Sequence, residues 1–343
     1  MTTGGRQIIG NLDCEVVWAG GAALPAAVTA RLAILATTLR VLDDDADLLW
    51  LPAAVPDGCI PDDGGPRPRL CWGPMPSGPF AARLAWGVDR RVSDLSAAAV
   101  ARGVNDRRFA AALAAGLGIA LPGARTITTV DELIEHLAAG AASASPTGAW
   151  VVKAAWTAAG RERVRRTGDR IDAATRTRVE RLLAVHGALV FEPWMARTLD
   201  VGQGGHVLPG GAVAILPPHR GLVDDGGVVR GIVIDDGAAL EDSEREQLAE
   251  VALAAGRALG AAGYLGPFVV DAFVHEHGGR RALHPLCELN ARWTFGLVAR
   301  AWADRRGAPL TLGLGGAMPP GGTALVIDEN GAPAAWVVDS HGS

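Results

Sequence analysis

Two predicted strands near the end of the chain constrain the fold more than any other feature of the sequence. They run from Phe268 to His275 and from Ala282 to Asn290 and flank Gly278-Gly279; Phe268, Val270, Ala272 and Val274 give the first strand one apolar face. Adjacent glycines in such a place predict a tight β-hairpin, because a two-residue turn needs positive φ at its central positions. The turn pairs His277 with Arg280, and this pairing sets the register of the whole hairpin.

The predicted register places three polar side chains on one face. Asp271 lies opposite Leu286, and because side chains alternate, Asp271, Glu288 and Asn290 project from the same side. The two carboxylates are then diagonal neighbours, about 7 to 8 Å apart. Their oxygens suit Mg²⁺ or Mn²⁺, which also bind substrate phosphates. The hairpin therefore predicts a cation site beside a nucleotide; the alternative is an ordinary solvated sheet face.

A zinc site competes for the same face. His275, His277 and His284 share it in the predicted register, with Cys287 or Glu288 nearby. Zinc is the weaker hypothesis, because His277 lies at the turn and Cys287 is expected to point to the other face. Whether the histidine cluster binds anything stays open.

Composition excludes several classes of protein. Of 343 residues, 49% are hydrophobic and 20% charged, which favours a globular chain over a disordered one. The net charge of −5 and the absence of long basic runs disfavour nucleic-acid binding. The sequence contains no apolar run typical of a membrane span or a secretion signal, so we expect a cytoplasmic protein. The four cysteines form no CxxC pair, which disfavours a disulfide framework.

Lys153 is the only lysine among the 32 lysine and arginine residues. Arginine replaces lysine almost everywhere in this sequence. A retained lysine therefore indicates a position whose function arginine cannot perform. Lysine is a compact point charge on a flexible stem, whereas arginine is a rigid planar fork. Lys153 is therefore a candidate functional residue.

The elements expected around Lys153 form a β-loop-α-β unit. Buried strands are predicted over residues 150–154 and 188–191, with a helix over 173–185 between them. Thr129 and Glu132 predict a capping box for a helix over 130–137, and Ser243 with Glu246 predicts the start of another over 243–259. The remaining expected elements are helices over 109–117 and 295–304, and strands over 200–207, 212–216 and 228–234.

The order of the expected strands and helices predicts three domains of mixed α/β class. Residues 1–104 form an N-terminal α/β domain, in which the stretch 52–79, with eight prolines, is expected to be a loop. Residues 105–192 form a small subdomain, and residues 193–343 form a C-terminal subdomain that carries the hairpin.

Four motifs follow one another in a recognisable order. They are Lys153 at a strand end, the loop Trp156-Thr157-Ala158-Ala159-Gly160-Arg161, the strand end Phe191-Glu192-Pro193-Trp194, and the hairpin with Glu288-Leu289-Asn290-Ala291-Arg292. This order and spacing resemble the ATP-grasp family, over residues 105 to 300. The motifs of P-loop and Rossmann nucleotide sites are absent. The resemblance implies an α+β ATP-grasp fold, in which two α+β subdomains clasp ATP after an N-terminal α/β domain.

The resemblance implies a nucleotide-binding role for a set of residues. Lys153 would meet the phosphates, and Arg107 would take the place of a second phosphate lysine that relatives commonly have. The other implied contacts are the loop over the triphosphate with Thr157, Gly160 and Arg161, the adenine hinge of Glu192, Pro193, Trp194 and Met195, and Asp200 at the ribose.

The resemblance also implies the reacting centre. Asp271, Glu288 and Asn290 match the ligands of two Mg²⁺ or Mn²⁺ ions, with Glu288 as the bridge. Arg292 would stabilise the transferring phosphoryl group or an acyl phosphate. Substrate contacts are proposed at His219, Arg220 and Arg230, which would suit an anionic substrate; the alternative is that these three are ordinary loop residues.

The implied activity is that of an ADP-forming carboxylate–amine ligase. A carboxylate would attack ATP to give an acyl phosphate, and an amine would convert it to an amide or peptide bond, releasing ADP and phosphate. The expected partners are small molecules, such as an amino acid or short peptide, with no nucleic acid or membrane. The alternatives are an ATP-grasp kinase of a non-carboxylate acceptor and a non-catalytic ATP-binding regulatory module. The oligomeric state stays open, a homodimer included.

Overall fold

The computed structural model describes residues 5–76, 80–156, 162–224, 226–235 and 239–339. The chain divides into two compact units. The first unit contains residues 1–99, 217–238 and 292–343, and the second contains residues 100–216 and 239–291. The three-domain division expected from the sequence stays a prediction. In the part of the chain that the structure describes, no helix is both long and apolar enough to cross a membrane.

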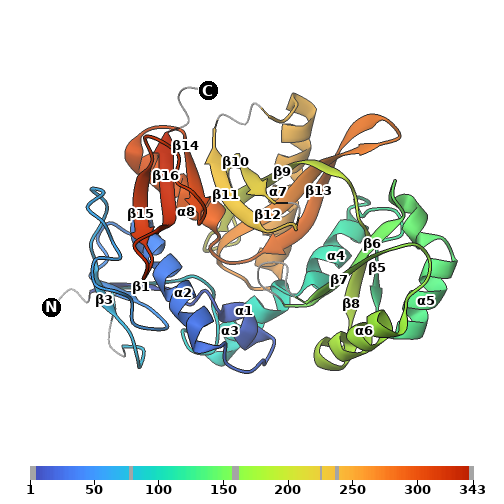
Figure 1. The fold of residues 1–343 in the computed structure, drawn as a ribbon, viewed down its shortest axis with the longest axis horizontal. Coiled ribbons are helices and arrows are strands. Elements are labelled where there is room, and N and C mark those ends of the chain that lie inside the picture. The colour runs from blue at the N-terminus through green and yellow to red at the C-terminus, as the bar shows by residue number, and fades with distance from the viewer. Residues whose placement is uncertain (1–4, 77–79, 157–161, 225, 236–238, 340–343) are drawn as a thin grey trace. The chain divides into compact units, whose positions relative to one another are not determined.

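A parallel sheet forms the N-terminal part of the first unit (Figure 1). Its strand order is β3-β2-β1-β4, with bounds Arg69–Cys71, Leu48–Trp50, Arg6–Ile9 and Ala82–Ala85. Ile8, Ile9 and Leu49 are completely buried, as expected for parallel strands covered on both faces. The helices α1 (Cys14–Trp18), α2 (Ala26–Ala36) and η1 (Thr37–Leu42) connect β1 to β2. The described part of the proline-rich stretch is loop apart from β3, as predicted.

The first unit also contains an antiparallel group of strands. The end of β10 (Val213–Val223) is followed in the sheet by β11 (Val229–Ile234), β14 (Leu310–Leu314), β16 (Pro333–Asp339) and β15 (Thr323–Ile327). Helix α8 (Phe295–Arg306) packs against β11, β14 and η1. The guanidinium of buried Arg40 lies 4.9 Å from the ring centroid of Trp302 and forms an ion pair with Asp63. The helix predicted over 295–304 is confirmed.

A small antiparallel sheet lies in the second unit. Its strand order is β5-β8-β6-β7, with bounds Arg125–Ile127, Leu189–Pro193, Ala149–Ala154 and Arg163–Thr167. Helices α5 (Val130–Ala138) and α6 (Ala173–His186) pack on its apolar face, and η2 (Ala141–Ala144) precedes β6. The capping box of Thr129 and Glu132 is confirmed. The sequence prediction missed β7.

A larger antiparallel sheet forms the rest of the second unit. Its order is β13-β12-β9-β10, with β13 at Arg280–Asn290, β12 at Gly266–His277 and β9 at Arg197–Val207. Helices α7 (Asp242–Ala261) and α4 (Arg107–Gly116) pack against it, and α3 (Leu95–Val104) precedes α4. One apolar cluster, which includes Leu248, Leu259 and Phe268, fills the interface between α7 and the strands. The start of α7 differs from the prediction, because Glu241 and Glu244 form its capping box.

The predicted hairpin turn is confirmed, but the predicted register holds only near the turn. His277 pairs with Arg280, as expected. Farther along the strands, Asp271 pairs with Glu288 and not with Leu286. The predicted diagonal relationship of the two carboxylates is therefore wrong, and they lie directly opposite each other.

An irregularity in β13 accounts for the difference. Phe273 still pairs with His284 in the register of the turn, and the register shifts between Phe273 and Asp271. As a result, residues 285–287 occupy the space opposite the single residue Ala272. The extra residues begin at Pro285, which has no N–H to donate to the ladder and is typical of strand irregularities.

Candidate active site

The small sheet has one apolar face and one charged face. Lys153 on β6 lies directly opposite Arg163 on β7, and both Arg165 and Glu192 pair with Val151, two residues before Lys153. Because side chains alternate along a strand, these charged residues share a face. The intervening residues form the buried face against α5 and α6; they are Trp150, Val152, Ala154, Val164 and Phe191.

Lys153 is held by a carboxylate at the base of this charged face. Its Nζ lies 2.6 Å from Glu192 Oε2, and only 12% of the lysine side chain is exposed. Burial lowers the pKa of Lys153, but Cys287, when ionised, and Glu192 raise it by more, so the pKa of the lysine is raised overall. Burial also raises the pKa of the Cys287 thiol, so near pH 7 the negative charge beside Lys153 is that of Glu192. Lys153 is therefore a fixed positive charge.

The hairpin supplies three oxygen-bearing side chains in one place. Asp271 lies opposite Glu288, Asn290 is two residues farther along β13, and Asn290 Nδ2 donates to Asp271 Oδ2 at 2.8 Å. Two carboxylates and an amide oxygen this close together fit a hard divalent cation such as Mg²⁺. The other face of the hairpin is apolar and lies in the core; it includes Val270, Ala272, Val274 and Leu289.

Arg107 connects the hairpin to the small sheet. It is the first residue of α4, directly after the N-cap Asp106, whose side chain accepts from the backbone of Arg108. Arg107 Nη2 lies 2.9 Å from Glu288 Oε1, and Nη1 donates to the carbonyl of Ala154 at 2.7 Å. The guanidinium thus lies between the strand that carries Lys153 and the carboxylate proposed to bridge cations.

Cys287 and Arg197 also belong to the site, and the sequence prediction missed both. Cys287 was expected to point away from the hairpin's polar face, but its Sγ lies 3.7 Å from Lys153 Nζ and 3.5 Å from Arg197 Nη2. The expectation is wrong because the extra residues after Pro285 break the alternation on which it depended. Pro285 itself was the available signal.

Arg197 contacts both a carboxylate and an aromatic ring in the site. Its Nη1 donates to Asp200 at 2.9 Å, and its guanidinium lies 4.2 Å from the ring centroid of Phe273. Asp200 pairs with Phe273 across β9 and β12, so the side chains of both residues lie on this face. Arg197 therefore holds the acidic residue that the resemblance places at the ribose.

The strand end predicted as an adenine hinge lies beside these groups. Pro193 is the last residue of β8, and the Trp194 backbone N–H donates to the Ala149 carbonyl at 2.8 Å, which continues the small sheet. Met195 is buried in a small cluster with Leu121, Phe273 and Cys287. The hinge segment is thus anchored at one end by the sheet and at the other by the core.

Positive charge concentrates around Trp194. The guanidinium of Arg165 lies 4.3 Å from a ring centroid of this indole, that of Arg197 lies 5.3 Å and that of Arg163 lies 5.6 Å from it. Burial lowers the pKa of Arg163, and the neighbouring charges of Arg197, Arg165 and Arg107 lower it further. Cations held this close repel one another, so a polyanion would relieve the repulsion.

Thr157, Gly160 and Arg161, the residues expected to cover the triphosphate, lie outside the described residues. Their role stays a prediction.

The histidine cluster does not form a metal site in the described part of the structure. No group of three or more histidine, cysteine, aspartate or glutamate residues is placed there to share an ion. His275 and His284 are both buried beside Phe273. Burial lowers the pKa of His284 to about 4, so this imidazole is neutral near pH 7. The side chain of His277 lies outside the described part.

The remaining predicted site residues belong to the first unit. Arg292 forms an ion pair with Glu15, with Nη2 and Oε1 2.5 Å apart. His219 is buried, and burial lowers its pKa to about 4. Arg220 pairs with Asp235 at 2.8 Å, and Arg230, an exposed residue, pairs with Asp224 at 2.7 Å; the substrate role of these residues stays a prediction.

Comparison with protein-family models and with curated proteins finds no match for this sequence. Solved structures, in contrast, are similar over nearly the whole chain. The N5-carboxyaminoimidazole ribonucleotide synthetase of Thermus thermophilus matches with a TM-score of 0.56 and 14% identity, covering 98% of this chain and 94% of that one. The corresponding synthase of Aspergillus clavatus, solved with ADP and 5-aminoimidazole ribonucleotide, gives 0.54 and 15%, covering 99% and 95%.

A second kind of enzyme is equally similar. The biotin carboxylase domain of the 2-oxoglutarate carboxylase of Hydrogenobacter thermophilus, solved with MgADP and bicarbonate, matches with a TM-score of 0.55 and 11% identity, covering 99% of this chain and 87% of that one. Identities this low establish the fold alone. The chain has the ATP-grasp fold, as the order of its four motifs predicts.

Proposed function

We propose that this protein is an ATP-dependent, ADP-forming ligase that activates a carboxylate as an acyl phosphate and transfers the acyl group to an amine. One observation carries the proposal. The cations Lys153 and Arg107 and the oxygen ligands Asp271, Glu288 and Asn290 are brought together from distant parts of the sequence. Phosphoryl transfer depends mainly on positioning and neutralising charge, and this is the set of groups that it needs.

The phosphates of ATP would enter the cluster of cations. Lys153 offers a point charge, and Arg163 and Arg165 on the same face add further donors. Arg107 would exchange part of its interaction with Glu288 for one with a phosphate oxygen, and so take the role of the second phosphate lysine. Asp271, Glu288 and Asn290 would hold Mg²⁺, which when bound neutralises charge on the β- and γ-phosphates.

The adenosine would bind at the hinge. Glu192 to Met195 offer backbone groups and apolar surface for the base, and Asp200 accepts hydrogen bonds from the ribose. Arg197 orients the Asp200 carboxylate in the structure. Solved structures of similar fold that contain ADP support this part of the proposal.

The proposed reaction has two steps. An oxygen of the substrate carboxylate attacks the γ-phosphorus, the bond to the β-phosphate oxygen breaks, and ADP leaves. The amine nitrogen then attacks the acyl carbon, loses a proton, and releases phosphate. Arg292, two residues after Asn290 in the sequence, would stabilise the charge on the acyl phosphate. The acid and the amine would be small molecules.

The experiment that tests the proposal is a trapping assay. Purified protein is incubated with MgATP, hydroxylamine and single carboxylic acids, and both ADP and hydroxamate are measured. We expect the two products in equal amounts for at least one acid, because hydroxylamine intercepts an acyl phosphate. ADP with a phosphorylated alcohol and no hydroxamate would favour the kinase alternative. AMP as the product, or tight ATP binding without any turnover, would contradict the proposal.

A further inference from the structure

Arg107 holds one of the two opposed carboxylates of the hairpin. Its Nη2 donates to Glu288 Oε1 at 2.9 Å, and the arginine side chain is only 12% exposed. Asp271 lies directly opposite Glu288 and accepts from Asn290 Nδ2 at 2.8 Å. Like charges directly opposite each other on a sheet repel, so the arginine and the amide stabilise a pair of carboxylates that would otherwise be unfavourable.

Arg107 is also fixed in place by the strand that carries Lys153. Its backbone N–H donates to the Ala155 carbonyl at 3.2 Å, and its Nη1 donates to the Ala154 carbonyl at 2.7 Å. Ala154 is the last residue of β6, and Ala155 follows it directly. The guanidinium is thus anchored through both its backbone and its side chain. Because a guanidinium keeps its charge in proteins, Arg107 supplies a fixed positive charge beside Glu288.

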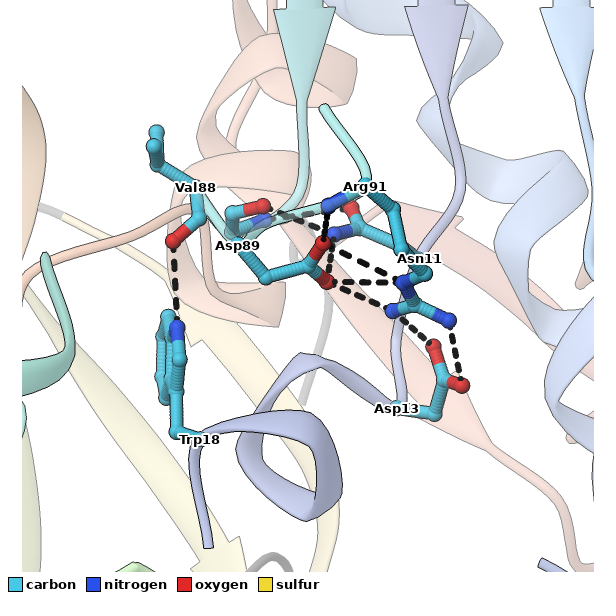
Figure 2. Close-up of polar contacts among 7 residues, drawn as sticks. Asn11, Asp13, Trp18, Val88, Asp89 and Arg91 are labelled. Carbon is cyan, nitrogen blue, oxygen red and sulfur yellow. Dashed lines mark hydrogen bonds and ion pairs between the residues drawn. The ribbon is translucent and has the colours of Figure 1, made fainter. Parts of the chain in front are cut away.

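The first unit contains a similar group of side chains around another arginine (Figure 2). Arg91 Nη2 lies 2.8 Å from Asp13 Oδ1 and 2.6 Å from Asp89 Oδ2. Asn11 Nδ2 also donates to Asp89 Oδ2, at 2.9 Å. One guanidinium therefore joins two carboxylates at hydrogen-bond distance, although the Asp89 side chain is completely buried. The hairpin site combines the same kinds of group: two carboxylates, an asparagine amide and an arginine.

The charged face of the small sheet adds further cations near Arg107. Burial and three neighbouring arginines lower the pKa of Arg163, whereas Glu288 raises it. Arg107 is one of these three arginines, so its charge and that of Glu288 both act on the face proposed to bind phosphate. A second divalent cation would add more positive charge to this crowded region, beside a carboxylate that Arg107 already neutralises.

We propose that Arg107 takes the place of a second metal ion, so that Asp271, Glu288 and Asn290 bind one divalent cation beside its guanidinium. Glu288 then bridges the arginine and this cation, instead of the two cations that the resemblance to the ATP-grasp family implies. A guanidinium has five N–H donors, so Arg107 can retain Glu288 and still donate to a phosphate oxygen. The inference rests on the proposed function, because the divalent cation is the one that would accompany ATP.

Counting bound metal ions tests this inference without turnover. The full-length protein is dialysed to equilibrium against Mn²⁺ and the β,γ-imido analogue of ATP, and the bound amounts of both are measured. Mn²⁺ that binds in the absence of the analogue is measured separately and subtracted. We expect the wild type to bind one Mn²⁺ for each bound analogue. Two ions for each analogue would overturn the inference.

Two substitutions of Arg107 separate its charge from its hydrogen bonding. Arg107→Gln keeps a side-chain donor for Glu288 but removes the charge, so we expect this variant to bind a second Mn²⁺. Arg107→Lys keeps the charge and should still bind one. The control is Arg257→Gln, the same change at an exposed position of α7, which should bind one Mn²⁺ like the wild type. A single Mn²⁺ in an Arg107→Gln protein that binds the analogue would also overturn the inference. If Arg107→Gln does not fold or does not bind the analogue, the wild-type count decides.

The outcomes separate this inference from the proposed function. Two Mn²⁺ ions in a wild-type protein that also forms hydroxamate would contradict the single-cation site and leave the ligase intact. One Mn²⁺ for each analogue, in a protein that releases no ADP with any acid, would support the single-cation site and contradict the ligase. No binding of the analogue by the wild type would contradict the proposed function, and this inference with it.

Discussion

Asp271 and Glu288 lie directly opposite each other across the hairpin, just beyond the point where Pro285 displaces the register. Directly opposed positions bring Cβ atoms within about 4.5 to 5.5 Å, so the two carboxylates can share a cation. Glu288 also accepts from Arg107 in the structure, which links the proposed cation ligands to the side chains proposed to bind phosphate. The hairpin register is thus the feature on which the proposed chemistry depends.

Glu288→Gln should abolish turnover and leave the fold intact. The amide keeps the shape of the side chain but loses the charge that would hold cations. The side chain is 32% exposed and its ion pair with Arg107 is partly in solvent, so we expect the unfolding free energy to change by less than about 1 kcal/mol. ADP release and urea unfolding measure the two effects. Glu276→Gln, the same change at an exposed position of β12, is the control and should turn over normally; full activity of Glu288→Gln would refute the cation assignment.

Lys153→Ala should remove the stabilisation that MgATP gives. A ligand that binds only the native state stabilises it by about 2.7 kcal/mol at a hundredfold excess over its dissociation constant. In the variant, Glu192 loses its partner and the phosphates lose a fixed charge. Thermal melts with and without MgATP provide the measurement. Arg257→Ala removes an exposed cation on α7 and should keep the wild-type shift; an equal shift in Lys153→Ala would rule out the lysine as a phosphate ligand.

Acid should destabilise the protein through its buried histidines. Burial lowers the pKa of both His284 and His219 to about 4, so between pH 6.5 and 4 the unfolded chain binds more protons than the folded one. Stability therefore falls with falling pH in this window, by about 2 kcal/mol per histidine between pH 7 and 5. Urea unfolding of His284→Phe at the two pH values should show a smaller loss than the wild type. An identical loss would mean that His284 does not titrate as described.

Gly313→Ala should destabilise the first unit. A Cβ at Gly313 would lie 2.1 Å from the ring of Trp336 on the neighbouring strand β16, so the indole would have to move. Overpacking of this kind typically costs about 1 to 3 kcal/mol. Gly103→Ala in α3, where a Cβ meets no atom within 4 Å, is the matched control and should be neutral or slightly stabilising. Equal unfolding free energies for the two variants would contradict the packing described.

Local signals in the sequence predicted much of the fold. The Gly278-Gly279 turn, the capping box at Thr129 and the order of the four motifs each depend on near neighbours in the chain, and the structure agrees with them. The strand β7 was missed because its sequence is mostly arginine, with Val164 as the single buried residue. Such a charged sequence resembles an exposed loop. Such a strand is recognisable only beside its partner β6.

The parts of the site that the sequence did not predict depend on distant contacts. Arg197 and Cys287 are 90 positions apart and meet only because β9 and β13 flank β12. The irregularity after Pro285 turned Cys287 toward Lys153, and no period-2 pattern anticipates an inserted pair of residues. Likewise, Glu15 and Arg292 lie near opposite ends of the chain, so no local sequence pattern predicts their ion pair.

Transfer of oxygen from the substrate carboxylate to phosphate is the most direct test of the central claim. An acid that supports ADP release is labelled with ¹⁸O in its carboxylate and incubated with MgATP and an amine, and the released phosphate is analysed by mass spectrometry. If a carboxylate oxygen attacks the γ-phosphorus, each phosphate carries one ¹⁸O atom. Unlabelled phosphate would show that the acid never formed an acyl phosphate, and would contradict the account.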